Sequence, residues 1–295
     1  MAADRTLAGI GFGLLAYGIW GFFPLYFRQL SQVTPMDVLS NRAAWACVFV
    51  GLLLTLRRQW PKVAAVCRKP RQLAMLALAA LLVGSNWLMF LWAVANHQVV
   101  ASSLGYFLTP LVNVVLGLLV LKERLNRLEW LSVALALAAI ANEVVALGGL
   151  PWVSLFLAAT FGTYGLVRKQ VQVDAISGLW LETLAMLPVC LIYAVWQGQA
   201  GHTVFGGHDA LTTALLVGAG IVTALPLMAF AAATQRLDLA TVGMLMYINP
   251  TMQFLTAVWI FGEPLDAVRL ISFGLIWAGL FLFSWGAWHK YRAAS

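Results

Sequence analysis

The sequence predicts an all-α integral membrane protein whose ten transmembrane helices form two inverted five-helix repeats. Composition, the length of the apolar runs and an internal duplication lead to this prediction. Of the 295 residues, 62% are hydrophobic and 10% are charged, whereas soluble domains have about 45–50% and about 25%. A single water-soluble core cannot bury that excess, so the lipid bilayer is the expected surrounding of most of the chain.

Ten apolar stretches follow one another along the sequence. A hydrocarbon layer about 30 Å thick needs about 20 apolar residues for each helical span. The stretches are continuously apolar rather than alternating, which excludes a transmembrane β-barrel. The predicted spans are Leu7–Phe27, Met36–Leu56, Leu73–Ala95, Val99–Leu121, Leu128–Leu147, Pro151–Val167, Ser177–Val195, Ala210–Ala233, Ala240–Ile260 and Val268–Ser284. The connections, the longest being residues 57–72 and 196–209, are too short for a separate domain.

Positive charges predict the orientation of the chain. Fifteen of the 18 Lys and Arg residues fall on one side of the predicted spans, six of them between Arg57 and Arg71. Such residues are kept on the cytoplasmic side, so we expect an inner-membrane protein with both termini in the cytoplasm. Contact with an anionic leaflet accounts for the net charge of +7, and no nucleic-acid partner is expected.

An internal repeat divides the chain. Residues 104–132 align without a gap over residues 244–272, which pairs Pro110 with Pro250 and Glu123 with Glu263. We therefore predict two related units, residues 1–147 and 148–295. Each unit holds five spans, an odd number, so the second must enter the membrane from the opposite side.

The charges of the two copies agree with opposed orientations. Positive residues in the first copy have uncharged counterparts in the second: Lys122, Arg124 and Arg127 against Gly262, Pro264 and Ala267. Inverted repeats allow alternating access, because the two halves can exchange conformations. This favours a secondary transporter, a permease or exporter of small organic solutes, over a passive channel.

Polar residues recur at helical spacing inside two equivalent spans. The fourth span carries Ser102, Tyr106, Thr109, Pro110 and Asn113, and the ninth carries Met246, Asn249, Pro250, Gln253 and Ala257. Amides in lipid need protein or water as partners, and each proline frees a carbonyl one turn back. We predict that Tyr106, Asn113, Asn249 and Gln253, together with Asn86 of the third span, line a cavity. Proline kinks with ordinary interhelical hydrogen bonds are the alternative.

Two charged residues lie within predicted spans. Arg42 is the candidate for attracting an anionic group of the substrate, and Glu182 is the candidate for binding a coupling proton or cation. Snorkelling of Arg42 and a structural role for Glu182 are the alternatives. Asp37 and Glu143 lie near span ends, where we expect water to reach them. Trp87, beside Asn86, is expected to pack.

Several classes of site have no signature in the sequence. The cysteines and histidines lack metal-ligand spacing, and no phosphate-binding loop occurs, so no metal and no cofactor are predicted. We expect that the chain is not an enzyme, since no catalytic dyad or clustered carboxylates appear. A passive channel and a membrane-embedded enzyme remain the alternative functions.

Several stretches resemble the EamA family of the drug/metabolite transporter superfamily, and most closely its RarD branch of chloramphenicol-sensitive proteins. They are Asn86–Trp87, Ser103–Gly117, Lys122–Leu125, Phe161–Gln170, Thr223–Leu237 and Tyr247–Phe254. The resemblance implies a ten-helix permease with a central cavity, and relatives that export amino acids, metabolites or drugs. We place Tyr164 and Tyr247, which lie in these stretches, in that cavity. Thr109 departs from the Asn-Pro pattern expected there. A monomer or homodimer is expected.

Overall fold

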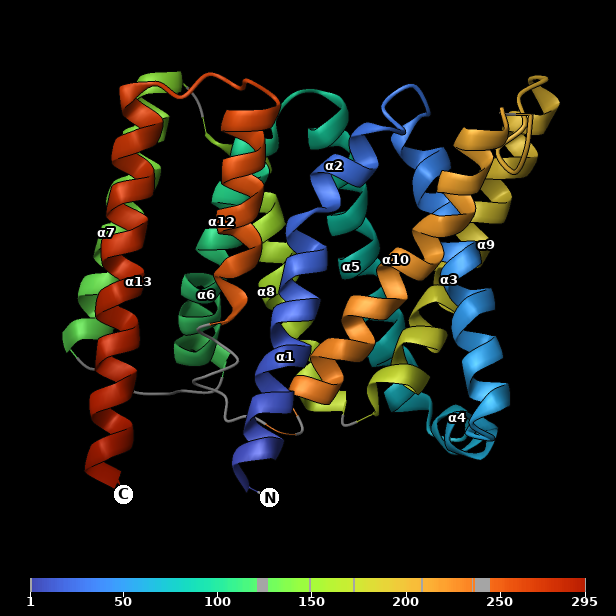
Figure 1. The fold of residues 1–295 in the computed structure, drawn as a ribbon, viewed down its shortest axis with the longest axis horizontal. Helices are drawn as coiled ribbons and strands as arrows, with labels where there is room; N and C mark the ends of the chain where they lie inside the picture. The colour runs from blue at the N-terminus through green and yellow to red at the C-terminus, as the bar shows by residue number, and fades with distance from the viewer. Residues whose placement is uncertain are drawn as a thin grey trace.

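The computed structural model describes residues 2–120, 127–148, 150–171, 173–207, 209–234, 236 and 245–294. These residues form helices and connecting turns, and no strand occurs among them. The helices stand side by side in one bundle (Figure 1). They are α1 (Ala2–Gly21), α2 (Phe23–Arg28), α3 (Pro35–Leu56), α4 (Trp60–Cys67), α5 (Pro70–Ala95), α6 (Val99–Val120), α7 (Arg127–Leu147), α8 (Trp152–Val171), α9 (Ala175–Gln199), α10 (Ala210–Thr234), α12 (Ile248–Leu255), the π-helix η1 (Thr256–Ile260) and α13 (Ala267–Ala294).

Two predicted spans are interrupted. The first is divided at Phe22 into α1 and α2, and α2 begins with Pro24 in its first turn, where a missing backbone N–H costs little. The ninth is broken at Tyr247, and α12 begins at the next residue, two positions before Pro250. Residues 240–244 of that span lie outside the described residues. The fourth span is a continuous helix through residue 110.

The connection at residues 57–72, which the hydropathy pattern leaves as a loop, contains the short helix α4. Its Val63 and Val66 are buried, whereas the surrounding cations Arg57, Lys62 and Lys69 are exposed. One apolar face on a short helix therefore ties the basic connection to the bundle. Hydropathy misses this helix because it is too short to span a membrane and most of its neighbours are charged.

Five helical segments of the described residues are long and apolar enough to cross a membrane. Large apolar side chains also cover the outside of the bundle, among them Leu56, Val145, Ile192 and Trp259, each more than two-thirds exposed. Such a surface suits lipid rather than water. The chain is thus an all-helical membrane protein, while the count of ten spans stays a prediction. Both termini lie at the same end of the bundle as α4 (Figure 1).

Helices of the two predicted repeats pack against one another. The main pairs are α1 with α10 and α12, α3 with α9 and α10, α5 with α8 and α9, α6 with α8 and α12, and α7 with α13. Glu263, after η1, also ties the halves together: its two carboxylate oxygens each accept a hydrogen bond of 2.8 Å, from the N–H groups of Val99 and Val100. An acid at a helix N-terminus satisfies unpaired donors and opposes the helix dipole.

Gly220 permits the closest approach between α10 and α3. A methyl group at this position would lie 2.5 Å from the backbone nitrogen of Ala46 and 2.6 Å from the Cβ of Trp45. A neighbouring backbone cannot move aside as a flexible side chain does. The separation of these two helices therefore depends on the absence of a side chain at Gly220.

Substitution Gly220→Ala is expected to lower the free energy of unfolding by about 1–3 kcal/mol, the usual cost of overpacking. Gly18→Ala is the matched control, because a methyl group there meets no atom within 4 Å; it should be neutral or stabilise by roughly 0.5–1 kcal/mol. Thermal unfolding of the purified proteins in detergent measures both. Equal melting temperatures for the two variants would contradict this packing.

Candidate functional site

Arg42 is a fully buried cation between the predicted halves. The side chain, on α3, is 2% exposed, so it does not snorkel to the surface. Its Cζ lies 4.0 Å from the ring centroid of Trp87, 5.1 Å from that of Phe27 and 5.3 Å from that of Phe23. Three aromatic faces therefore surround the guanidinium, and Trp87 contributes the nearest one instead of packing alone.

The guanidinium of Arg42 is only partly satisfied. Its Nε donates a hydrogen bond of 2.6 Å to Oγ1 of Thr223 on α10, a hydroxyl that itself donates to the carbonyl of Ala219. Nη1 is buried without a hydrogen-bond partner among the described residues. Cation–π contacts contribute up to about 2 kcal/mol each, while burying an ion costs several kcal/mol. An anionic partner would pair with Nη1 of Arg42 and offset the remaining cost of burying its charge.

Asn86 and Tyr106 form a buried polar link beside this arginine. Nδ2 of Asn86 donates to the carbonyl of Leu157 at 3.0 Å and to Oγ1 of Thr160 at 2.9 Å, both on α8. The Tyr106 hydroxyl donates to Oδ1 of Asn86 at 3.1 Å. These bonds hold α5, α6 and α8 in register, and they satisfy the amide that sequence analysis assigned to a cavity.

Aromatic rings connect the Asn86–Tyr106 link to Arg42 on one side and to Glu182 on the other. Phe90 lies between Phe27 and Tyr106, with ring centroids 6.2 and 6.1 Å away. On the other side, Phe161 lies 5.9 Å from Tyr106 and 5.9 Å from Tyr164. We call the chain of contacts from Arg42 through Tyr106 to Glu182 the polar–aromatic row.

Glu182 ends the polar–aromatic row in a buried ion pair. The Tyr164 hydroxyl donates to Oε2 of Glu182 at 3.1 Å, and Nη1 of Arg168 lies 3.2 Å from Oε1. Glu182 is 1% exposed and the Arg168 side chain 18%. The guanidinium lies so close to Gly178 that a methyl group there would overlap it. Gly178, which has no side chain, therefore leaves room for the Arg168–Glu182 ion pair.

Arg168 is not among the predicted site residues because the predicted sixth span ends at Val167. The helix α8 continues to Val171, which places Arg168 one turn after Tyr164 on the same face. The sequence signal for this site was the i, i+4 spacing of Tyr164 and Arg168, followed in the next span by the acid Glu182. The positive-inside pattern instead assigned Arg168 to the solvated connections.

Two further predicted cavity residues, Asn249 and Gln253, lie on α12, and Tyr247 directly precedes this helix. Nε2 of Gln253 donates to Oδ1 of Asn249 at 2.8 Å and to the carbonyl of Trp20 at 3.4 Å. Tyr247 is half-buried. The side chains of Pro110 and Asn113, as well as residues Lys122–Arg124, lie outside the described part of the chain. Among these residues, hydrogen bonds join Asn249 with Gln253 and Asn86 with Tyr106.

Two acids expected near water are buried. Asp37 is 1% exposed, and its Oδ2 lies 3.2 Å from Nε2 of His202 in the α9–α10 connection. Glu143, on α7, is 4% exposed. The expectation that water reaches Asp37 was wrong, because His202 of the α9–α10 connection lies against its carboxylate. Glu143 instead lines a pocket near the end of its span.

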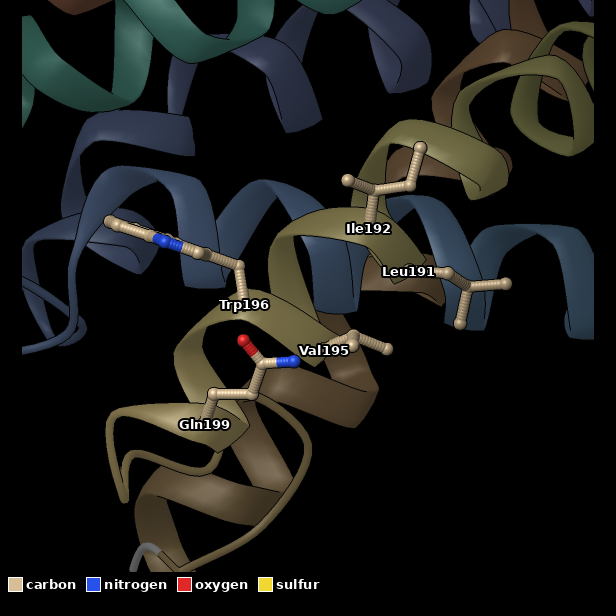
Figure 2. A pocket seen from close by; sticks show the side chains of 5 residues that line it. All are labelled: Leu191, Ile192, Val195, Trp196 and Gln199. Atoms are coloured by element: carbon tan, nitrogen blue, oxygen red, sulfur yellow. The ribbon is translucent and has the colours of Figure 1, made fainter.

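Two pockets lie away from the polar–aromatic row. Figure 2 shows the first, a shallow groove along the outside of α9 lined by Leu191, Ile192, Val195, Trp196 and Gln199. These mostly apolar, exposed side chains form a surface suited to lipid. The second pocket lies among α6, α7, α8 and α13.

Comparison with known proteins identifies the family. Residues 7–142 and, separately, residues 149–285 match the EamA-like transporter family. The chain belongs to this family. Protein RarD of Escherichia coli is 40% identical over 295 residues, which cover the whole of both chains. An uncharacterized transporter of Vibrio cholerae is 43% identical over 276 residues, or 94% of this chain and 91% of the relative.

A further EamA relative and a solved structure extend the comparison. The chloramphenicol-sensitive protein RarD of Pseudomonas aeruginosa is 33% identical over 281 residues, which cover 94% of this chain and 93% of the relative. One crystal structure, titled only as that of a protein, has a TM-score of 0.59 at 20% identity and covers 94% of this chain and 96% of the other. The first result supports a RarD-type EamA assignment, and the second shows a shared fold. The chain is a membrane transporter and a multi-pass protein of the inner membrane.

Proposed function

We propose that this EamA protein is a secondary-active transporter of small organic solutes, working by alternating access between two inverted five-helix repeats. The observation that carries the proposal is the buried, partly unpaired guanidinium of Arg42 at one end of the polar–aromatic row. A cation inside the membrane is costly and marks a substrate or ion path. We place residues 1–147 and 148–295 in the two repeats, and both termini in the cytoplasm.

The helix contacts support inverted repeats. Each helix of the first predicted repeat has a counterpart in the second: α1 with α8, α3 with α9, α5 with α10, α6 with α12 and α7 with α13. Exchanging the members of every pair turns the α1–α10 contact into the α8–α5 contact. The same exchange turns α3–α10 into α9–α5 and α6–α8 into α12–α1, and it leaves α3–α9, α6–α12 and α7–α13 unchanged. Two halves with equivalent contacts can interchange their conformations, which is the basis of alternating access.

The chemistry of the row favours a solute with an anionic group and a flat apolar part. Nη1 of Arg42 offers a charge-assisted hydrogen bond to a carboxylate, and the ring of Trp87 beside it offers a stacking face. Aromatic amino acids, and metabolites or drugs that carry both a carboxylate and an aromatic ring, have this combination. Arg42, Asn86 and Tyr106 are the proposed contacts in the first half, with Asn113, Tyr247, Asn249 and Gln253 facing the same path after rearrangement.

Glu182 is the proposed coupling residue. As a carboxylate it is paired with Arg168 and accepts from Tyr164. Protonation removes its charge and with it the attraction to Arg168, which would release α9 from α8. Movement at this contact would then be linked to a proton gradient.

Transport by purified protein in liposomes tests the role of Arg42. Once radiolabelled amino acids and chloramphenicol have been screened for a substrate, Arg42→Gln should weaken competition by a carboxylate-bearing compound at least tenfold, since a charge-assisted hydrogen bond contributes roughly 1.5–3 kcal/mol. Competition by the corresponding amide should change little. Arg71→Gln, on an exposed residue of α5, is the matched control.

Equal weakening for the acid and the amide would show that Arg42 serves structure and not recognition. Kinetics in the same vesicles separate the other functions: saturable, gradient-driven uptake indicates a carrier, non-saturating flux a channel, and chemical turnover an enzyme.

Glu182→Gln should abolish stimulation of uptake by a pH gradient while substrate exchange between the two faces continues, because a neutral amide cannot bind the proton. Asp174→Asn is the control: Asp174 caps the N-terminus of the same helix by accepting from the N–H of Ser177, and asparagine can cap as well. Wild-type pH dependence in Glu182→Gln would exclude the coupling role.

A further inference from the structure

A second polar pocket opens at the end of the bundle opposite both termini. Its volume is about 360 Å³, and side chains of four helices line it. Gln98 and Leu104 come from the α6 region, Glu143 from α7, Trp152 from α8, and Arg269 and Phe273 from α13. It is separate from the polar–aromatic row, none of whose residues line it.

Glu143 is a buried acid without a partner in this pocket. It is 4% exposed, and its Oε1 has no hydrogen-bond partner among the described residues. Four residues separate it from the end of α7, or about 6 Å of helical rise. A buried, unpaired polar group costs roughly 1–3 kcal/mol and a charged one more. A ligand that donates hydrogen bonds or carries positive charge would remove this cost.

Arg269 supplies the opposite charge to the same pocket. Its Nη1 donates to the carbonyl of Pro264 at 2.8 Å, which leaves other donors of the planar guanidinium for a ligand. No ion pair joins it to Glu143 in the part of the chain that the structure describes. The pocket thus presents a carboxylate and a guanidinium that do not neutralise each other directly.

The rim of the pocket is apolar and lies near the ends of predicted membrane spans. Leu150 and Trp152 line it and are 67% and 51% exposed, and tryptophan is typical of the membrane–water interface. The pocket also lies between the closely packed α7–α13 pair and the helices α6 and α8. A ligand there could extend acyl chains along the outside of the bundle.

We propose that this pocket binds the headgroup of a zwitterionic aminophospholipid, phosphatidylethanolamine. Glu143 accepts hydrogen bonds from the primary ammonium group, Arg269 binds the phosphate, and the acyl chains follow the apolar rim past Leu150 and Trp152. Bound lipid joins the α7–α13 pair to the rest of the bundle. The site is independent of the proposed transport path, so its test does not require transport.

Lipid titration of the purified full-length protein tests the proposal. Thermal stabilisation is measured with dioctanoyl phosphatidylethanolamine, phosphatidylglycerol and phosphatidylcholine, and with free phosphoethanolamine. Phosphatidylethanolamine should bind at least tenfold more tightly than the other two lipids, because only its headgroup has a positive charge that also donates hydrogen bonds. Glu143→Gln should remove this preference, and Arg269→Gln should weaken phosphatidylethanolamine and phosphatidylglycerol alike. Asp209→Asn, on an exposed acid before α10, should behave as wild type.

Three outcomes would overturn the proposal: no headgroup preference in the wild type, a preference that survives both substitutions, or phosphoethanolamine binding as tightly as the lipid. The last would indicate a soluble ligand. If Glu143→Gln does not fold, stepwise N-methylation of phosphatidylethanolamine probes the same contact on the wild-type protein. Affinity should then fall with each methyl group, and unchanged affinity would contradict the role of Glu143.

Discussion

The burial of one cation, Arg42, organises the middle of this transporter. A guanidinium without water must be compensated by its neighbours, and here three aromatic rings and one hydroxyl provide that compensation. These groups come from α2, α5 and α10, so the cation fixes the relative positions of helices from both predicted repeats. Nη1 of Arg42 has no hydrogen-bond partner among the described residues, which makes this guanidinium a candidate binding group.

The second buried charge is compensated differently. Glu182 has a charged partner, Arg168, and a hydroxyl donor, Tyr164, so its neighbours stabilise it directly. A pair of this kind is stable while both members are charged and is strongly weakened when one is neutralised. The two ends of the polar–aromatic row therefore suit different tasks: one end can accept an anion, and the other can respond to a proton.

Much of the architecture could be predicted from the sequence, because hydropathy reports helices directly and each predicted span has a helical counterpart among the described residues. The candidate residues were harder to group. The helical stripe grouped Tyr106 with other residues of its own helix and could not show that its partner is Asn86 of another helix. Arg168 was missed because the end of α8 was placed four residues too early, and the burial of Asp37 and Glu143 depends on tertiary contacts that no single span encodes.

Accessibility of position 106 tests the central claim most directly. With Cys47, Cys67 and Cys190 replaced by serine, a Tyr106→Cys variant is exposed to a membrane-impermeant thiol reagent from each face of oriented vesicles. The account predicts labelling from both faces, slowed by transported substrate, because the polar–aromatic row opens alternately to either side. Labelling only by a lipid-soluble reagent, without protection by substrate, would show that Tyr106 faces the bilayer and would contradict the account.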